Sequence, residues 1–300
     1  MKIGPAVDDF LQHCAIERRL SENTLRAYAS DLSDFAAWLA ASNPAEVGTE
    51  TLKAYLKAMV SDRKLAVTTV RRRMACLRSF FRRAADRDRV SDPFAGWKLA
   101  LPKRKILPKA LTRGEVASLF VQSDMRVRGT GAFEESLAMA LRLIVATGLR
   151  VGELCKLRVL DIAADGTSLR VTGKGSRDRL VYITDDDFRA KLQKLTELRY
   201  NASGASAPLL VNRYNSRLQP QTVRLRLHRA AAVAGLARRI TPHMLRHTAA
   251  TLLIETGIDI RIVQRLLGHS SIATTEIYTH VSDEALRSSL ARANVLGSFG

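Results

Sequence analysis

Apolar residues recur every three or four positions along most of this 300-residue chain. That spacing places them on one face of an α-helix, so the sequence predicts a succession of amphipathic helices. The only convincing alternation with period two lies at 168–183, where apolar residues flank a Gly-Lys-Gly tripeptide and predict a β-hairpin. The expected fold is therefore mainly α, with a small β-hairpin sheet.

A basic segment with two prolines divides the chain. Residues 99–110, LALPKRKILPKA, have no helical periodicity, and their prolines favour an extended backbone. We expect a helical domain at 1–98, a linker at 99–110, and a second domain at 111–300 that carries the hairpin. In the second domain, residues 124–132 are Gly-rich and polar and predict a loop.

The net charge of +19 indicates an anionic partner. Positive charge of that size opposes folding by self-repulsion unless a polyanion relieves it, and the usual polyanion is nucleic acid. Residues 61–110 hold 15 basic and 4 acidic side chains, so +11 of the net charge lies in one sixth of the chain. An acidic small-molecule substrate explains the composition less well.

We expect this basic region to contact DNA phosphates. A helix at 67–85 has one apolar face and one basic face, and the linker adds further cations. The expected DNA-binding side chains are Arg71, Arg72, Arg78, Arg82, Lys103, Arg104 and Lys105. The alternative is a basic face that only meets solvent.

Composition and motifs exclude several other classes of protein. No apolar run approaches the roughly 20 residues that span a bilayer, and the N-terminus has no signal-peptide apolar region. Cys14, Cys76 and Cys155 are far apart and odd in number, which predicts reduced core thiols. No metal-ligand cluster and no phosphate-binding glycine loop is visible. We therefore expect a soluble cytoplasmic protein, associated with the nucleoid, that needs no membrane, metal or cofactor.

The segment at 241–248 predicts a phosphate site. Thr241 is a good N-cap and Pro242 suits the first helical position, so His243 lies in the first turn, where free N–H groups favour an anion. Arg246, three residues on, shares a face with His243. Imidazole, guanidinium and a helix N-terminus together suit a phosphate.

Two further motifs complete a pattern: ATGLRVGEL at 146–154 and LLGHSSIATTEIYTHV at 266–281. Together with HMLRHT at 243–248, they resemble the tyrosine recombinases of the phage-integrase and Xer superfamily. The resemblance of the catalytic domain covers residues 111–281, and the N-terminal helical block resembles the SAM-like core-binding domain of that family. The resemblance implies a two-domain clamp around DNA.

The resemblance also implies an active site. Its six catalytic residues would be Arg150, Lys174, His243, Arg246, His269 and Tyr278. Two arginines offer forked, permanently charged donors for the charge that develops on phosphate oxygens, and we expect Glu153 to orient Arg150. A free tyrosine hydroxyl has a pKa of about 10, so the nucleophile needs proton removal or a cationic site.

The implied activity is site-specific DNA recombination through a 3′-phosphotyrosyl intermediate, without metal or ATP. The implied substrate is double-stranded DNA with inverted half-sites, bound by a homo-tetramer on synapsed DNA, with or without a related recombinase. Chromosome-dimer resolution, plasmid resolution and movement of a mobile element all stay open. The alternative functions are DNA relaxation of the type IB topoisomerase kind, and DNA binding without catalysis.

The end of the chain predicts one more helix, from 282 to 293. Its apolar stripe comprises Ala285, Leu286, Leu290 and Ala293. We expect this helix to dock on a neighbouring protomer; the alternative is that it caps its own domain.

Overall fold

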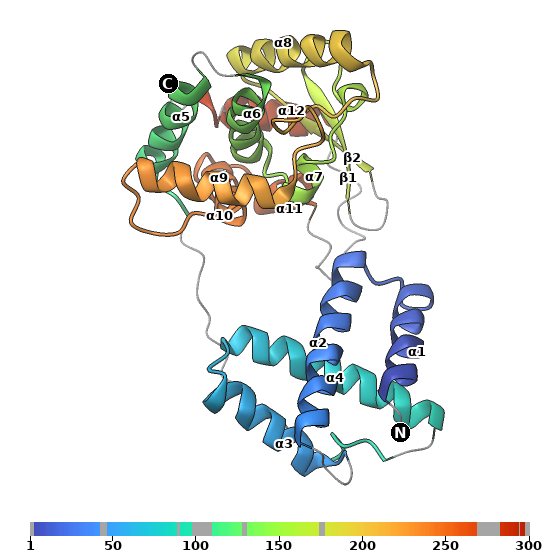
Figure 1. Cartoon of the computed structure of the whole chain (residues 1–300). Coiled ribbons are helices and arrows are strands. Elements are labelled where there is room, and N and C mark those ends of the chain that lie inside the picture. Colours follow the sequence, from blue (N-terminus) through green and yellow to red (C-terminus); the bar gives the residue numbers. More distant parts are fainter. Residues whose placement is uncertain are drawn as a thin grey trace. The chain divides into compact units, whose positions relative to one another are not determined.

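The computed structural model describes residues 3–42, 47–88, 91–97, 110–127, 131–173, 178–268, 283–293 and 295–297. The chain forms two compact units, Met1–Ile106 and Leu107–Gly300 (Figure 1). The division falls inside the segment that we expect to be a linker, of which residues 99–109 lie outside the described ranges. The predicted fold class is confirmed, because the described ranges are mainly helical with one two-stranded antiparallel sheet in the second unit.

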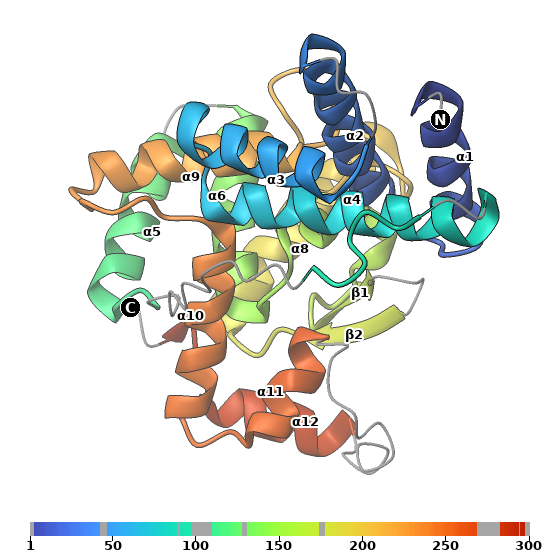
Figure 2. The same ribbon diagram turned by 90° about the horizontal axis from the view of Figure 1, so that it is seen from below.

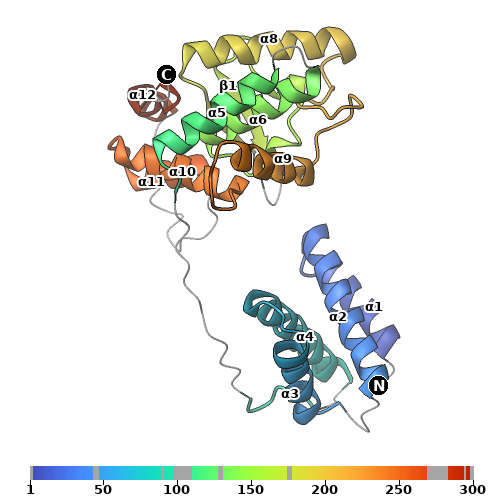
Figure 3. The same cartoon turned by 60° about the vertical axis from the view of Figure 1, so that its left-hand side comes forward.

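The described residues of the first unit form helices joined by short turns and loops, with no strand among them. Its elements are α1 (Ile3–Ile16), α2 (Glu22–Ser42), α3 (Thr49–Lys57), a π-helical turn (Ala58–Asp62) and α4 (Val67–Asp88). Both α1 and α4 pack on α2 (Figure 3). The core is aromatic: the ring centroids of Phe35 and Tyr55 lie 4.9 Å apart, and those of Phe10 and Phe80 lie 5.5 Å apart. Such edge-to-face contacts add to the gain from burying the rings.

The second unit is built around one apolar helix. Its elements are α5 (Arg113–Val127), α6 (Ala132–Thr147), α7 (Val151–Leu154), a 3-10 turn (Val159–Asp161), β1 (Ser168–Thr172), β2 (Asp178–Tyr182), α8 (Asp186–Ser203), α9 (Pro220–Val233), α10 (Pro242–Glu255), α11 (Ile260–Leu267) and α12 (Asp283–Ala293). The central helix is α6, because most of its residues are buried and α5, α9 and α10 all pack on it. Figures 1 and 3 show α8 on the opposite side of α6 from α9 and α10.

The hairpin has one inward and one outward face. In its register Leu169 pairs with Val181, and Val171 pairs with Arg179. Leu169, Val171 and Val181 are buried in the core of the second unit. The outward face carries Arg170, which is exposed. Period-two alternation thus places Arg179 on the inward face.

The loop predicted at 124–132 is partly wrong. Helix α5 continues to Val127, and α6 begins at Ala132. The guanidinium of Arg142, on α6, donates to the carboxylate of Asp124 at 2.5 Å. This tertiary contact ties the last turn of α5 to α6, which the local composition does not reveal.

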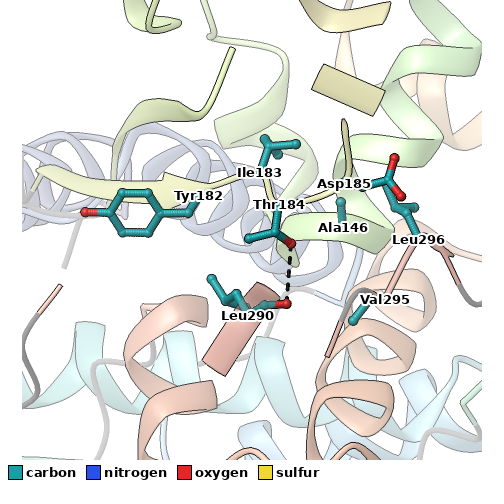
Figure 4. Close-up of a pocket in the computed structure, with 8 residues that line it drawn as sticks. All are labelled: Ala146, Tyr182, Ile183, Thr184, Asp185, Leu290, Val295 and Leu296. Atoms are coloured by element: carbon teal, nitrogen blue, oxygen red, sulfur yellow. Dashed lines mark hydrogen bonds between the residues drawn. The ribbon is translucent and has the colours of Figure 1, made fainter. Parts of the chain in front are cut away.

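The last helix, α12, packs on its own unit in the single chain, which is the alternative that the sequence allows, and docking on a neighbouring protomer stays a prediction. Leu290 and Ala293 are buried, and the hydroxyl of Thr184 donates to the carbonyl of Leu290 at 3.3 Å (Figure 4). The cavity left beside this contact is about 20 Å³, room for about one water molecule. Two members of the apolar stripe, Leu290 and Ala293, are thus buried within the single chain.

Candidate active site

The turn between α6 and α7 presents Arg150. Gly148 ends α6 with φ +64, and its N–H donates to the carbonyl of Ile144 at 2.8 Å. Arg150 is the N-cap residue of α7, and its side chain is 42% exposed. Its guanidinium is therefore open to a ligand on one side.

Glu153 contacts Arg150 through two hydrogen bonds. The Arg150 backbone N–H donates to Oε2 of Glu153 at 3.0 Å, and Nη1 of Arg150 donates to Oε1 at 2.8 Å. Glu153 is buried, and burial opposes ionisation of its carboxyl. Hydrogen bonds from Arg179 and Arg150 outweigh that cost and hold the pKa of Glu153 below its usual value.

Arg246 is the buried arginine of the site. It lies on α10, whose N-cap Thr241 accepts a hydrogen bond from the N–H of Met244 and whose first residue is Pro242, as the sequence predicts. Arg246 donates to the carbonyl of Gly148 at 2.5 Å and to that of Leu267 at 2.7 Å. Burial, and then repulsion from Arg150, lowers the pKa of Arg246 to about 10, so it keeps its charge at neutral pH.

His243 lies one turn before Arg246 and is exposed. Its place in the first turn of α10 leaves the imidazole accessible while the arginine is held inside. The two side chains share a helix face, as the spacing predicts.

Three of the expected catalytic residues, Lys174, His269 and Tyr278, lie outside the described residues, and so do Lys103, Arg104 and Lys105 of the linker. In the sequence, Lys174 is the second residue after β1, and His269 directly follows Gly268, the C-cap of α11.

Sequence reasoning missed Arg179. This side chain on β2 donates from Nη1 and Nη2 to the two carboxylate oxygens of Glu153, at 3.3 and 2.9 Å, and from Nε to the carbonyl of Leu266 at 3.1 Å. β2 lies beside the C-terminal end of α11 (Figure 2). One signal could have found Arg179: a charged residue on the inward face of a strand needs a buried partner.

The basic face predicted on α4 is divided in the structure. Arg82 is exposed and Arg71 is partly exposed. Arg72 makes an ion pair with Asp31, whose side chain is fully buried. Arg78 donates to the carbonyl of Trp97 at 3.3 Å and lies over the ring of Phe94. Two of the four arginines are thus held by protein groups, although Arg72 stays 45% exposed.

A groove of about 480 Å³ opens in the first unit between α1, α2 and α4. Its ionisable lining is mostly basic and comprises His13, Arg18, Arg78, Arg82, Arg83 and Asp86. Arg18, in the turn after α1, donates to the hydroxyl of Ser79 on α4 at 2.7 Å, so an arginine from outside α4 joins the groove. No local sequence signal identifies Arg18, because its position depends on how α1 packs.

Within the described ranges, no three His, Cys, Asp or Glu side chains are grouped so that they could hold a metal ion. Over the same ranges, no helix is long and apolar enough to cross a membrane. Cys14, Cys76 and Cys155 are buried free thiols.

Arg150 and Arg246 lie around a glycine turn, His243 lies at a helix start, and the first unit is helical and basic. Together these features define a protein that handles DNA phosphates. Residues 109–285 match the phage integrase family, and residues 7–88 match the N-terminal SAM-like domain of phage integrases. The chain belongs to this family of tyrosine recombinases. It is a site-specific recombinase of the Xer-like kind, an enzyme that breaks and rejoins DNA.

Two Xer recombinases are similar in sequence to this chain over nearly its whole length. Tyrosine recombinase XerD of Caulobacter vibrioides is 36% identical over 97% of this chain and 96% of its own length. Tyrosine recombinase XerC of Mycobacterium sp. strain JLS is 38% identical over 94% of this chain and 95% of its own length. The chain is thus similar to proteins of both names.

Solved structures show the same fold. A lambda integrase dimer bound to a COC′ core site matches with a TM-score of 0.71 and 22% identity, over 94% of this chain and 99% of that chain. A lambda integrase tetramer bound to a Holliday junction matches with a TM-score of 0.70 and 23% identity, over 90% of this chain and 74% of that chain. These relatives bind DNA core sites and form tetramers on Holliday junctions.

Proposed function

We propose that this recombinase cuts one strand at a time through Tyr278. The phenol releases its proton to solvent, which the cationic site favours, and the phenolate oxygen attacks the scissile phosphorus. The bond from phosphorus to the 5′ oxygen of the next nucleotide breaks, and that oxygen leaves as a hydroxyl after taking a proton from Lys174. The product is a 3′-phosphotyrosyl bond and a free 5′-hydroxyl. The 5′-hydroxyl of a partner strand then attacks the phosphotyrosyl bond and reverses the chemistry. Because the phosphotyrosyl bond conserves the energy of the broken phosphodiester, no ATP is needed.

The observation that carries this proposal is the convergence of Arg150 and Arg246 on the end of α11. Arg246 donates to the carbonyl of Leu267, and Arg150 donates to that of Gly268 at 2.9 Å. The next residue in the chain is His269, and Tyr278 follows nine residues later. Both guanidiniums have N–H groups to spare, since each has five and these contacts use few of them.

In this site the two arginines neutralise the non-bridging oxygens of the phosphate as charge builds up in the transition state. His243 and His269 donate further hydrogen bonds, and Glu153 orients Arg150. No step of this scheme requires a metal or a redox cofactor, because the cationic side chains supply the charge and Lys174 supplies the proton.

We infer that the first unit binds the duplex along α4, with Arg18 and Arg82 of the groove and Arg71 elsewhere on α4 contacting phosphates. The enzyme then works as a homo-tetramer on two synapsed sites, each made of inverted half-sites. Such a reaction belongs in the cytoplasm, at the nucleoid.

Replacement of the nucleophile tests the proposal. Tyr278→Phe removes one oxygen, so we expect DNA binding and thermal unfolding to match the parent while the covalent protein–DNA adduct disappears. Tyr200→Phe, at an exposed position on α8, is the control and should form adduct normally. Adduct formation by Tyr278→Phe would show that another tyrosine is the nucleophile.

A further inference from the structure

Three successive carbonyls at the C-terminal end of α11 accept hydrogen bonds from three different arginines. Leu266 accepts from Arg179, Leu267 from Arg246 and Gly268 from Arg150. The last carbonyls of a helix have no partner within the helix, and cationic donors are favoured there by the helix dipole. This end of α11 is therefore the point at which the site's arginines are gathered.

Arg179 is the arginine that joins this helix end to Glu153. Its Nε contacts α11, while both of its Nη atoms contact the Glu153 carboxylate on α7. A Cβ built on Gly268 would lie 3.3 Å from Cζ and Nη1 of Arg179, so the guanidinium packs closely against the backbone there. The side chain of Arg179 is only 16% exposed and is held by contacts to both α7 and α11.

Glu153 needs this second cation. Its side chain is 8% exposed, and a buried carboxylate with a single cation is costly. Arg179 shares the carboxylate, so Glu153 fixes the direction of Arg150 while most N–H groups of Arg150 stay available. The cluster of Arg150, Arg179, Arg246 and Glu153 keeps a net positive charge, as a phosphate requires.

We propose that Arg179 is a positioning residue of the recombination site, which sets Arg150 through Glu153 and sets the end of α11 through the carbonyl of Leu266. The inference rests on the proposed role of Arg150 at the scissile phosphate. Arg179 does not contact DNA in this scheme. Its loss therefore slows strand cleavage and leaves the affinity for DNA unchanged.

The test measures single-turnover cleavage of a nicked duplex that traps the covalent adduct, at saturating DNA. Arg179→Met should slow cleavage by about 10²-fold, the order of loss expected when reacting groups are misplaced by about 1 Å. Arg179→Lys keeps the positive charge but loses the forked guanidinium, so it should cleave faster than Arg179→Met and more slowly than the parent. Half-site affinity should stay within about twofold of the parent for both. Arg170→Met, on the outward face of β1, is the matched control and should cleave normally.

A double-mutant cycle shows whether Arg179 acts through Glu153. Arg179→Met combined with Glu153→Gln should be about as slow as the slower single variant, because both changes break the same link. Fully additive losses would overturn the proposal, and so would weaker DNA binding with a normal cleavage rate. If Arg179→Met does not fold, the Arg179→Lys variant provides the test. Cleavage by Arg179→Lys at the parental rate at saturating DNA would overturn the proposal.

Arg150→Ala in the same assay separates this inference from the proposed function. A normal rate for Arg150→Ala would remove the role of Arg150 at the phosphate. A slow Arg150→Ala beside a normal Arg179→Met would leave the proposed function standing and overturn the positioning role alone.

Discussion

Arg246 donates a hydrogen bond at 2.5 Å to the carbonyl oxygen of Gly148, a residue 98 positions earlier in the chain. Gly148 has φ +64, and a Cβ there would lie 2.2 Å from Cδ2 of Leu267. Leu267 is buried and its own carbonyl accepts from Arg246. The turn at Gly148 thus accepts a hydrogen bond from Arg246, precedes Arg150 by two residues and packs against the end of α11.

Gly148→Ala should damage both stability and cleavage. The left-handed φ costs about 1 to 3 kcal/mol for a residue with a side chain, and the added methyl displaces Leu267 in a packed core. Circular dichroism of the full chain should show easier unfolding, with slower adduct formation. Gly152→Ala is the control, because the Cβ it would add meets no atom within 4 Å beyond its chain neighbours and the backbone of its own helix. Equal stability of the two variants would refute the importance of this turn.

Arg82 should contribute one phosphate contact. Arg82→Ala removes an exposed cation at the basic groove, so we expect weaker DNA binding and a smaller dependence of affinity on salt, with the slope reduced by about 1. Titration of labelled duplex at several salt concentrations measures this slope. Lys53→Ala, on α3 and paired with Glu50, should leave it unchanged. An unchanged slope for Arg82→Ala would place the DNA elsewhere.

Asp34 should stabilise the first unit in a pH-dependent way. Hydrogen bonds from Arg63, followed by one from Tyr55, lower the pKa of Asp34 from 3.8 to about 2. A lowered pKa in the folded state adds stability at pH values above 3.8, and that stability disappears as the pH falls towards 2. Allowing for solvent screening, the contribution at neutral pH is about 1 to 2 kcal/mol.

Asp34→Asn tests this contribution. Trp38 and Trp97 are the only tryptophans of the chain and both lie in the first unit, so their fluorescence reports its unfolding within the full protein. The variant should be less stable at pH 7 and nearly equal to the parent near pH 2. Asp62→Asn, at an exposed position, should follow the parent at both. A destabilisation of Asp34→Asn that is the same at both pH values would contradict the assigned cause.

Leu290 should stabilise the single chain, because α12 packs on its own unit. Leu290→Ala removes a buried side chain and should cost about 2 to 4 kcal/mol. The measurement is thermal unfolding at a concentration where the protein is monomeric. Ser288→Ala, on the exposed side of α12, is the control. Unchanged monomer stability for Leu290→Ala, together with lost recombination, would instead support docking of α12 on a neighbouring protomer.

Much of the site could be predicted from sequence because its signals are local. The N-cap Thr241, the left-handed glycines Gly148 and Gly268, and the spacing of Arg150 from Glu153 are all set within a few residues. Backbone geometry and capping act over this range, so the spacing of residue types is enough to predict them. The mainly helical fold and the hairpin follow from periodicity in the same way.

The sequence by itself thus determined the helices, the hairpin, the chemical types in the site and the basic character of the first unit. Only the tertiary structure decided that Arg179 reaches Glu153 and Leu266, that Asp31 holds Arg72, and that α12 packs on its own core. The physical reason is the range of the contacts. Arg179 and Leu266 are 87 residues apart, and Asp31 and Arg72 are 41 apart. Such pairs form because buried charges must find partners, and the packing of whole helices selects which ones.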